Sequence, residues 1–297
     1  MGGHLAAALA QAGHQVFSSV YARAAGPGEV RVDLSRPEQL ARLPRHIEAV
    51  VHAAGNVDPR RPRKVMFGAN VLATQHLAAW ARAQRCVHFV QLSSVAVYGP
   101  LTLGEERSER TARLGTLGLP YMRTKARAER VVEQAGVPYT LLRLPAVLGV
   151  GDTVVTRGFV DALARGGLPM IPGASLRPRV SLVFAQGVAD IVARLLEHGP
   201  LGAPLHAVDV ELGLGELVSA YARVLGRPIG QRDTSWVEAL GLRNEVGLAW
   251  LIASSRFGQH YLRDRLVSEL GYRSRHSLDS AIQGGLSGLQ GENVGLF

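Results

Sequence analysis

The amino-acid sequence predicts an α/β fold built on a parallel sheet. Short apolar, β-rich runs alternate with helical patterns through the first half of the chain, as in successive βαβ units. The run 49–53 is apolar apart from one histidine, as expected of a strand covered by helices on both faces. After residue 149 the alternation weakens, which predicts a smaller and mostly helical second lobe.

In the first half, apolar side chains recur at helical spacing over 2–12 and over 70–84. Both segments are therefore predicted to be helices, and a third is predicted over 121–134. Between them, β-rich apolar runs predict the strands 15–20, 30–32, 49–53, 87–92 and 138–144.

In the second half, Gly and Pro cluster over 166–178, which predicts a loop beside a substrate. The remaining patterns predict strands at 180–184 and 204–208, helices at 187–197 and 214–225, and a mostly helical tail over 235–290. The strand at 204–208 is expected to return to the main sheet. We predict two domains, a nucleotide-binding domain over 1–148 and a substrate-binding lobe over 149–297.

Composition narrows the class of protein. Hydrophobic residues make up 47% of the 297 residues and charged residues 19%, as in ordinary globular proteins. The single cysteine, Cys86, excludes an internal disulfide and predicts no metal cluster. No apolar run approaches the roughly 20 residues of a membrane span, so we expect a cytoplasmic protein without a membrane partner.

The formal net charge of +9 raises the question of nucleic acid. The arginines are scattered, however, and the one dense cluster, 60–64, has no aromatic residues interleaved. We interpret it as a solvated loop and expect no nucleic-acid partner.

Tyr121 and Lys125 form the most informative constellation. Residues four apart share a helix face, so the phenol and the ammonium are expected to point into one site. A nearby ammonium lowers the pKa of a phenol, which could then exchange a proton with a substrate oxygen. Ser94, in the serine pair 93–94, could bind that same oxygen. Lys64 and Lys125 are the only lysines of the chain, and arginine is a poor substitute for a compact ammonium.

These residues belong to an ordered set of motifs. The set comprises Gly2-Gly3-His4-Leu5, Asp33-Leu34, His52-Ala53-Ala54-Gly55, Asn70-Val71, Ser93-Ser94 with Tyr98-Gly99, Tyr121 with Lys125 and Glu129, and Arg143-Leu144-Pro145-Ala146-Val147. Through it the chain resembles the extended short-chain dehydrogenase/reductase family, also called the NAD-dependent epimerase/dehydratase family, from residue 1 to about 225. The resemblance implies a Rossmann-like, doubly wound parallel sheet and a nicotinamide cofactor.

The resemblance also implies roles for particular residues. Catalysis would fall to Ser94, Tyr121 and Lys125, with Asn70 supporting a proton relay. The cofactor would be bound by Gly2, Arg23, Asp33, Leu34, Ala53, Ala54, Gly55, Lys125, Pro145 and Val147. Three plainer interpretations stay open: a surface acid for Asp33, a core turn for 52–55 and a helix cap for Asn70.

The choice of cofactor depends on the second strand. NAD-binding units usually place an acid there for the ribose 2′-hydroxyl, whereas 18–23 contains none. Arg23, helped by Ser19, could face a 2′-phosphate instead. We therefore favour NADP over NAD.

The glycine motif that binds the pyrophosphate in this family is incomplete in this sequence. Relatives begin with a strand and three spaced glycines, whereas this chain starts at the last glycine of the pattern. The first strand is therefore expected to be missing from the centre of the sheet. Either Met1 is an internal methionine with residues missing upstream, which we favour, or the chain is truncated and binds cofactor poorly.

The resemblance implies hydride transfer to or from a ketone or secondary alcohol. Val95-Ala96 stand where sugar-nucleotide dehydratases carry an Asp-Glu pair, which argues against dehydration. A nucleotide-sugar epimerase is the alternative, in which Arg177 or Arg179 could hold a substrate phosphate. A non-catalytic, NADP-binding redox sensor is the alternative of another class. The substrate would be a small molecule, and a homodimer through 70–84 and 121–134 is possible by resemblance.

Overall fold

A computed structural model describes the chain apart from residues 22, 101–103, 105, 153, 243–244 and 290–297. Its centre is a parallel sheet with the strand order β3–β4–β5–β9. The strands are β3 (Ala49–His52), β4 (His88–Ser94), β5 (Tyr139–Leu144) and β9 (Pro204–His206). The last of them confirms the predicted return of the segment near 204–208 to the main sheet.

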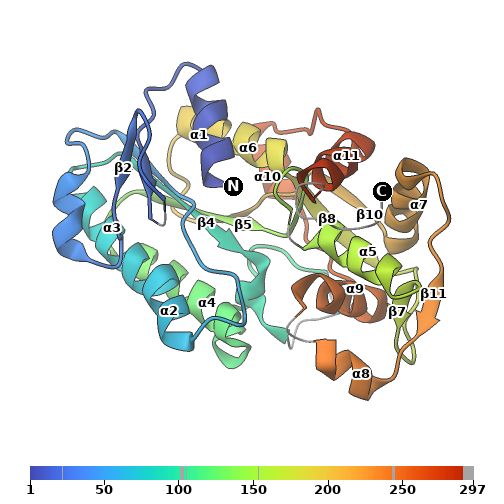
Figure 1. The fold of residues 1–297 in the computed structure, drawn as a ribbon. Coiled ribbons are helices and arrows are strands. Elements are labelled where there is room, and N and C mark those ends of the chain that lie inside the picture. The colour runs from blue at the N-terminus through green and yellow to red at the C-terminus, as the bar shows by residue number, and fades with distance from the viewer. Residues whose placement is uncertain (22, 101–103, 105, 153, 243–244, 290–297) are drawn as a thin grey trace.

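Helices cover both faces of this sheet, as Figure 1 shows. On one face lie α1 (Gly2–Gln11) and α6 (Ala185–His198), which pack against Val90 and Leu142. On the other face lie α3 (Ala73–Ala83) and α4 (Pro120–Gln134), which pack against Phe89 and Leu141. Neighbouring residues of one strand thus pack into opposite cores, which explains why apolar residues follow one another in these strands.

A second, two-stranded parallel sheet pairs β1 (Ser18–Val20) with β2 (Glu29–Arg31). In the expected order the first strand of the fold lies between the second and the fourth. Among the described residues no strand pairs with both β1 and β3, so the two sheets remain separate. The short helix η1 (Pro37–Arg42) follows β2.

The helix predicted over 70–84 is part of a longer helical stretch. It starts with α2 (Arg63–Phe67), continues through the π-helical turn η2 (Gly68–Leu72) and ends with α3. Asn70 lies inside the π-helical turn rather than at a helix start, so the helix-cap interpretation is wrong.

The remaining elements form the C-terminal part of the fold. β6 (Ala146–Leu148) pairs with β8 (Arg179–Phe184), which also pairs with β10 (Val210–Gly213), and β7 (Leu168–Met170) pairs with β11 (Gln231–Asp233). The helices are α5 (Val155–Ala164), α7 (Leu214–Leu225), α8 (Trp236–Gly241), α9 (Val246–Phe257), α10 (Asp264–Leu270) and α11 (Leu278–Leu289). Of the tail predicted to be helical, 243–244 and 290 lie outside the described residues. Except for α8 and α10, these helices supply residues to one large core around Phe159 and Tyr221.

Candidate active site

The predicted catalytic residues meet at the carboxyl ends of the central strands. β4 and β5 are parallel and α4 connects them, so α4 begins beside the end of β4. Pro120 occupies the first turn of α4, where its missing N–H leaves no helical hydrogen bond unmade. Tyr121 follows in the same turn and Lys125 one turn later.

Ser94 is the member of the serine pair that faces the site. Its Oγ accepts a hydrogen bond from the backbone N–H of Ala96 at 3.2 Å, and its hydroxyl lowers the pKa of the nearby Tyr121 phenol. Ser93 points the other way and donates to Glu129 Oε1 at 2.6 Å, as alternation along a strand requires. The chain after Ser94 turns through Gly99 at φ 74°, where an added Cβ would lie 2.7 Å from the carbonyl oxygen of Leu114. Glycine is therefore required in this turn.

Lys125 is almost fully buried, with 8% of its surface exposed. Its Nζ donates to the carbonyl oxygen of Leu92 at 2.7 Å, and this hydrogen bond joins α4 to the last residues of strand β4. Burial lowers the pKa of this ammonium to about 8, although the carboxylate of Glu129 acts in the opposite direction.

The pKa of Tyr121 departs from the expectation. Burial raises it above the ordinary value, and the nearby Ser94 hydroxyl offsets only part of that rise. The sequence argument considered Lys125 alone and predicted a lower pKa, so the predicted direction is wrong for this structure. Desolvation of the phenolate is the physical reason, and helical spacing gives no sign of it.

Asn70 joins two parts of the site. Its Oδ1 accepts from the backbone N–H of Asn56 at 2.6 Å, and its Nδ2 donates to the carbonyl oxygen of Asn56 at 2.9 Å. Nδ2 also donates to Thr124 Oγ1 on α4 at 3.0 Å. The side chain thus pins the loop after β3 to the catalytic helix. These contacts are structural, and the relay predicted for Asn70 stays a prediction.

Behind the site lies a buried ionic pair that the sequence argument did not single out. Arg143 on β5 donates to both carboxylate oxygens of Glu129, at 3.0 and 2.8 Å. Neither side chain is more than 2% exposed. Arg143 also donates to the Tyr98 hydroxyl at 2.9 Å. The spacing of Tyr121, Lys125 and Glu129 along one helix face was the available signal, since it places all three toward the sheet.

Small residues line the expected nucleotide path. α1 begins at Gly2, where a helix N-terminus offers unpaired N–H groups and the positive end of the helix dipole to an anion. A Cβ added at Gly2 would lie 3.9 Å from Cβ of Ala53, just after β3. A Cβ added at Gly55 would lie 3.1 Å from Asn70 Oδ1. These positions fit a dinucleotide whose phosphates approach the backbone closely.

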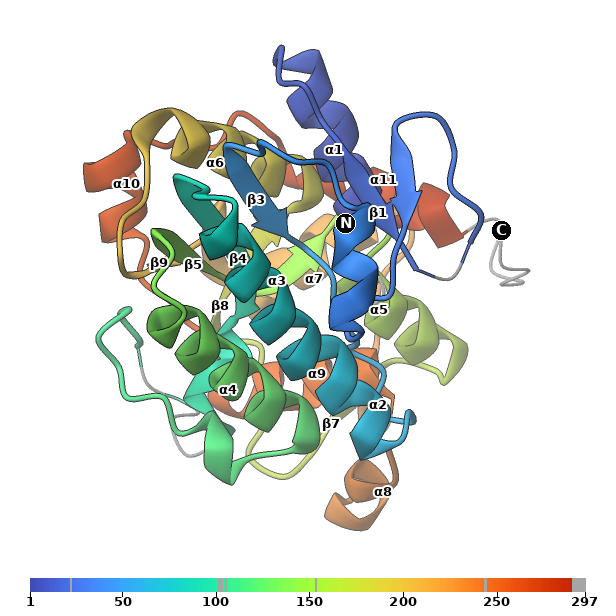
Figure 2. The same cartoon turned by 90° about the vertical axis from the view of Figure 1, so that its left-hand side faces the viewer.

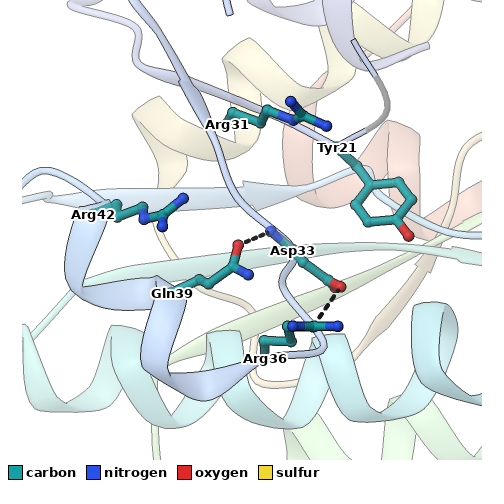
Figure 3. Close-up of a pocket in the computed structure, with 6 residues that line it drawn as sticks. All are labelled: Tyr21, Arg31, Asp33, Arg36, Gln39 and Arg42. Atoms are coloured by element: carbon teal, nitrogen blue, oxygen red, sulfur yellow. Dashed lines mark hydrogen bonds and ion pairs between the residues drawn. The ribbon is translucent and has the colours of Figure 1, made fainter. Parts of the chain in front are cut away.

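A groove of about 290 Å³ lies after β1 and β2, where the sequence predicts the adenosine end of the cofactor (Figure 3). Its lining consists of Tyr21, Arg31, Asp33, Arg36, Gln39 and Arg42. Asp33 Oδ1 accepts from the hydroxyl of Ser35 at 2.6 Å, and Oδ2 lies 3.4 Å from Arg36 Nε. The carboxylate predicted to contact adenine therefore already has protein partners.

Four other predicted cofactor residues lie apart from this groove. Arg23 forms an ion pair with Glu29 instead of lining it. Leu34 is buried in the core beside α3. Val147 pairs with Val183 in the β6–β8 ladder, and Pro145 precedes that strand.

Comparison with known proteins identifies the family of the chain. The model of the NAD dependent epimerase/dehydratase family matches residues 1–210. The chain belongs to this family. The chain accordingly has a Rossmann-like fold, and the members of its family are enzymes.

One curated relative is a ceramide reductase from Caulobacter vibrioides (strain NA1000 / CB15N), 29% identical over 205 residues. The match covers 66% of this chain and 56% of that protein, so the chain spans little more than half of the relative's length.

Two solved structures share the fold. WbmH of Bordetella bronchiseptica in complex with NAD⁺ has a TM-score of 0.74 and 17% identity, covering 97% of this chain and 94% of that one. RMD of Pseudomonas aeruginosa complexed with NADPH has a TM-score of 0.68 and 20% identity, covering 98% and 95%. Among the described residues of this chain, no helix is long and apolar enough to cross a membrane.

Proposed function

We propose that this family member is an NAD(P)-dependent oxidoreductase that transfers hydride to or from a ketone or secondary alcohol. The observation that carries the proposal is the placement of Ser94 at the end of β4 beside Tyr121, with Lys125 on the next turn of the helix that carries Tyr121. Family membership and the relative named as a reductase support it.

Each residue of the candidate active site has its own role in the proposed reduction. The nicotinamide, when bound, supplies or accepts the hydride. Ser94 holds the substrate oxygen, and Tyr121 gives that oxygen a proton as the carbonyl carbon is reduced. The raised pKa keeps the phenol protonated at neutral pH, which suits the reducing direction. The ammonium of Lys125 then stabilises the phenolate left behind.

The cofactor would extend from Tyr121 along the carboxyl ends of the strands. Lys125 would hold the nicotinamide ribose, with Pro145 and Val147 beside the ring. Gly2, Ala53, Ala54 and Gly55 would leave room for the pyrophosphate and adenosine ribose. Asp33 would border the adenine, whereas the side chain of Leu34 packs in the core beside α3.

We favour NADP, but on different residues from those the sequence suggested. Glu29 neutralises Arg23, so Arg23 is a weak partner for a 2′-phosphate. Arg31, Arg36 and Arg42 border the groove at the adenosine end, with Asp33 as the only acid of its lining. That excess of positive charge favours a phosphate there.

Fluorescence titration with NADPH and NADH tests the preference. We expect Arg31→Gln to weaken NADPH binding about tenfold and to leave NADH unchanged, because only NADPH carries the 2′-phosphate. Arg23→Gln serves as the matched control and should alter neither affinity appreciably. An equal loss for both nucleotides in Arg31→Gln would contradict the assignment.

The serine pair offers a test of the chemistry. With long-chain aliphatic ketones as substrates, Ser94→Ala should lower NADPH consumption about 100-fold, because a donor to the developing oxyanion is lost. Ser93→Ala removes a neighbouring hydroxyl that points away from the site and should leave the rate within a few-fold. Equal rates in the two variants would refute the proposed role of Ser94.

The two alternatives are separated by the same assay. A nucleotide-sugar epimerase, favoured by the exposed Arg177 just before β8 and the exposed Arg179 at its start, would interconvert UDP-sugars without net consumption of NADPH. A redox sensor would bind nucleotide and turn over neither class of substrate.

A further inference from the structure

Helices α2 and α4 lie side by side beside the candidate active site. They pack against each other, and the guanidinium of Arg127 on α4 lies 5.9 Å from the ring centroid of Phe67 on α2. Each helix follows a strand of the parallel sheet, so each begins at the edge of the sheet where Ser94 lies. We call residues 56–67 and 115–131 together the α2–α4 face.

The exposed charge of this face has one sign. Its exposed basic side chains are Arg60, Arg61, Arg63, Lys64, Arg123, Arg127 and Arg130. The segments contain two acids. Asp58 is paired with Arg60 at 2.9 Å, and Glu129 is buried. A surface so unbalanced attracts an anionic partner.

Large apolar side chains stand exposed at the start of both helices. Leu117 is 64% exposed and Leu119 62%, just before α4, and Val65 is 49% exposed on the first turn of α2. α8 adds Trp236 at 46% and Val237 at 81%. Figures 1 and 2 both place α8 at the lower end of the molecule, where α2 and α4 also lie.

We propose that the α2–α4 face docks onto an anionic lipid bilayer, with α8 touching the same surface. Basic side chains would meet the headgroups, while Leu117, Leu119 and Val65 would enter the interfacial layer. The sequence analysis expects no membrane partner, because no segment is apolar over the length of a membrane span. Peripheral docking needs no such segment, so this proposal departs from that expectation.

Charge decides against a second copy of the chain as the occupant. A two-fold contact through α4 would bring Arg123, Arg127 and Arg130 near their own copies. The outward residues of α3, namely Gln75, Ala79, Arg82 and Ala83, add no large apolar side chain that would offset that repulsion. Nucleic acid would use the arginines but would leave the exposed leucines without a role.

Docking would bring the mouth of the candidate active site to the membrane. A ketone carried by a lipid could then reach Ser94 and Tyr121 without crossing water. That consequence rests on the proposed function, whereas the docking itself does not.

Co-sedimentation with vesicles tests the docking directly. The chain should bind vesicles made of equal parts phosphatidylcholine and phosphatidylglycerol, and not vesicles of phosphatidylcholine alone. Arg123→Gln with Arg127→Gln should weaken binding on the order of 20-fold, since each basic residue at an anionic surface adds roughly fivefold. Leu117→Ser with Leu119→Ser should weaken it also at high salt, where the charge effect is screened.

The opposite edge of the sheet provides the controls. Arg45 and Val87 are exposed just before the amino ends of β3 and β4, so Arg45→Gln and Val87→Ser should bind vesicles like the parent chain. Thermal melting confirms that each variant folds. Absence of binding to anionic vesicles, or equal loss in the controls, would overturn the proposal. A dimer in light scattering that only the α2–α4 variants abolish would assign the face to a second copy instead.

Discussion

At the scale of single residues, we expect Lys125 to be the side chain that tolerates substitution least. It is buried, donates to the carbonyl oxygen of Leu92 at 2.7 Å, and has a pKa lowered to about 8. A bulkier guanidinium would have to displace strand β4 or Tyr121. Helical spacing could predict that Tyr121 and Lys125 share a face, but not that desolvation governs both pKa values, because burial is a property of the assembled fold.

We predict that Lys125→Arg lowers the turnover number at least 100-fold, since the larger planar group cannot hold the same position. The chain offers a matched control in its other lysine. Lys64 is exposed on α2, and Lys64→Arg should keep full turnover. Steady-state kinetics of Lys125→Arg and Lys64→Arg compare their turnover numbers, and their melting temperatures show that both variants fold. Comparable turnover in the two variants would contradict the role assigned to Lys125.

The pKa of Lys125 also predicts a pH dependence. Because the folded-state pKa lies near 8, below its usual value of 10.5, the ammonium is lost as pH rises through 8. Loss of that charge removes the stabilisation of the phenolate, so the reductive rate should fall between about pH 7.5 and 9. A rate that stays level to pH 9 would exclude Lys125 as the charged partner.

The lowered pKa of Lys125 also determines how the free energy of unfolding changes with pH. Between pH 8 and 10.5 the unfolded chain binds more protons at this lysine than the folded chain does. Its contribution to the free energy of unfolding therefore rises with pH across that window and is unfavourable below it. Urea titrations of the parent chain and Lys125→Met across this window would show the difference.

At the scale of elements, helix α4 carries the site and anchors it. Tyr121, Lys125 and Glu129 follow at successive turns, and Glu129 is held by Arg143 from strand β5. The helix itself and the neighbouring strands follow from sequence periodicity. The π-helical turn around Asn70 does not, because it depends on the contacts of Asn70 with Asn56 and Thr124, which come together only in the fold.

We predict that Glu129→Gln lowers the free energy of unfolding by about 3–5 kcal/mol, because it leaves Arg143 buried without its counter-charge. Glu133 lies one turn further on and pairs with Arg113 at 2.9 Å, while 28% of its side chain is exposed. Glu133→Gln is thus the matched control and should cost less than about 1 kcal/mol. Equal effects in urea denaturation would show that burial of the pair adds nothing.

At the scale of the whole molecule, the parallel sheet, its covering helices and the returning strand β9 follow the sequence pattern closely. The pairing of β7 with β11 could not be predicted, since the partners are distant in sequence and only three residues long. The basic and apolar α2–α4 face also escaped prediction. Its residues are scattered along the chain, and the basic cluster at 60–64 becomes part of a larger basic surface only because the fold places it beside α4.

The measurement that tests the central claim most directly is turnover by Tyr121→Phe, with nucleotide affinity measured on the same sample. The substitution removes one hydroxyl, and Tyr139→Phe, a change far from Ser94 at the start of β5, is the control. We predict that Tyr121→Phe binds NADPH like the parent chain but reduces long-chain ketones at least 100-fold more slowly, while Tyr139→Phe does both normally. Undiminished ketone reduction by Tyr121→Phe would contradict the account.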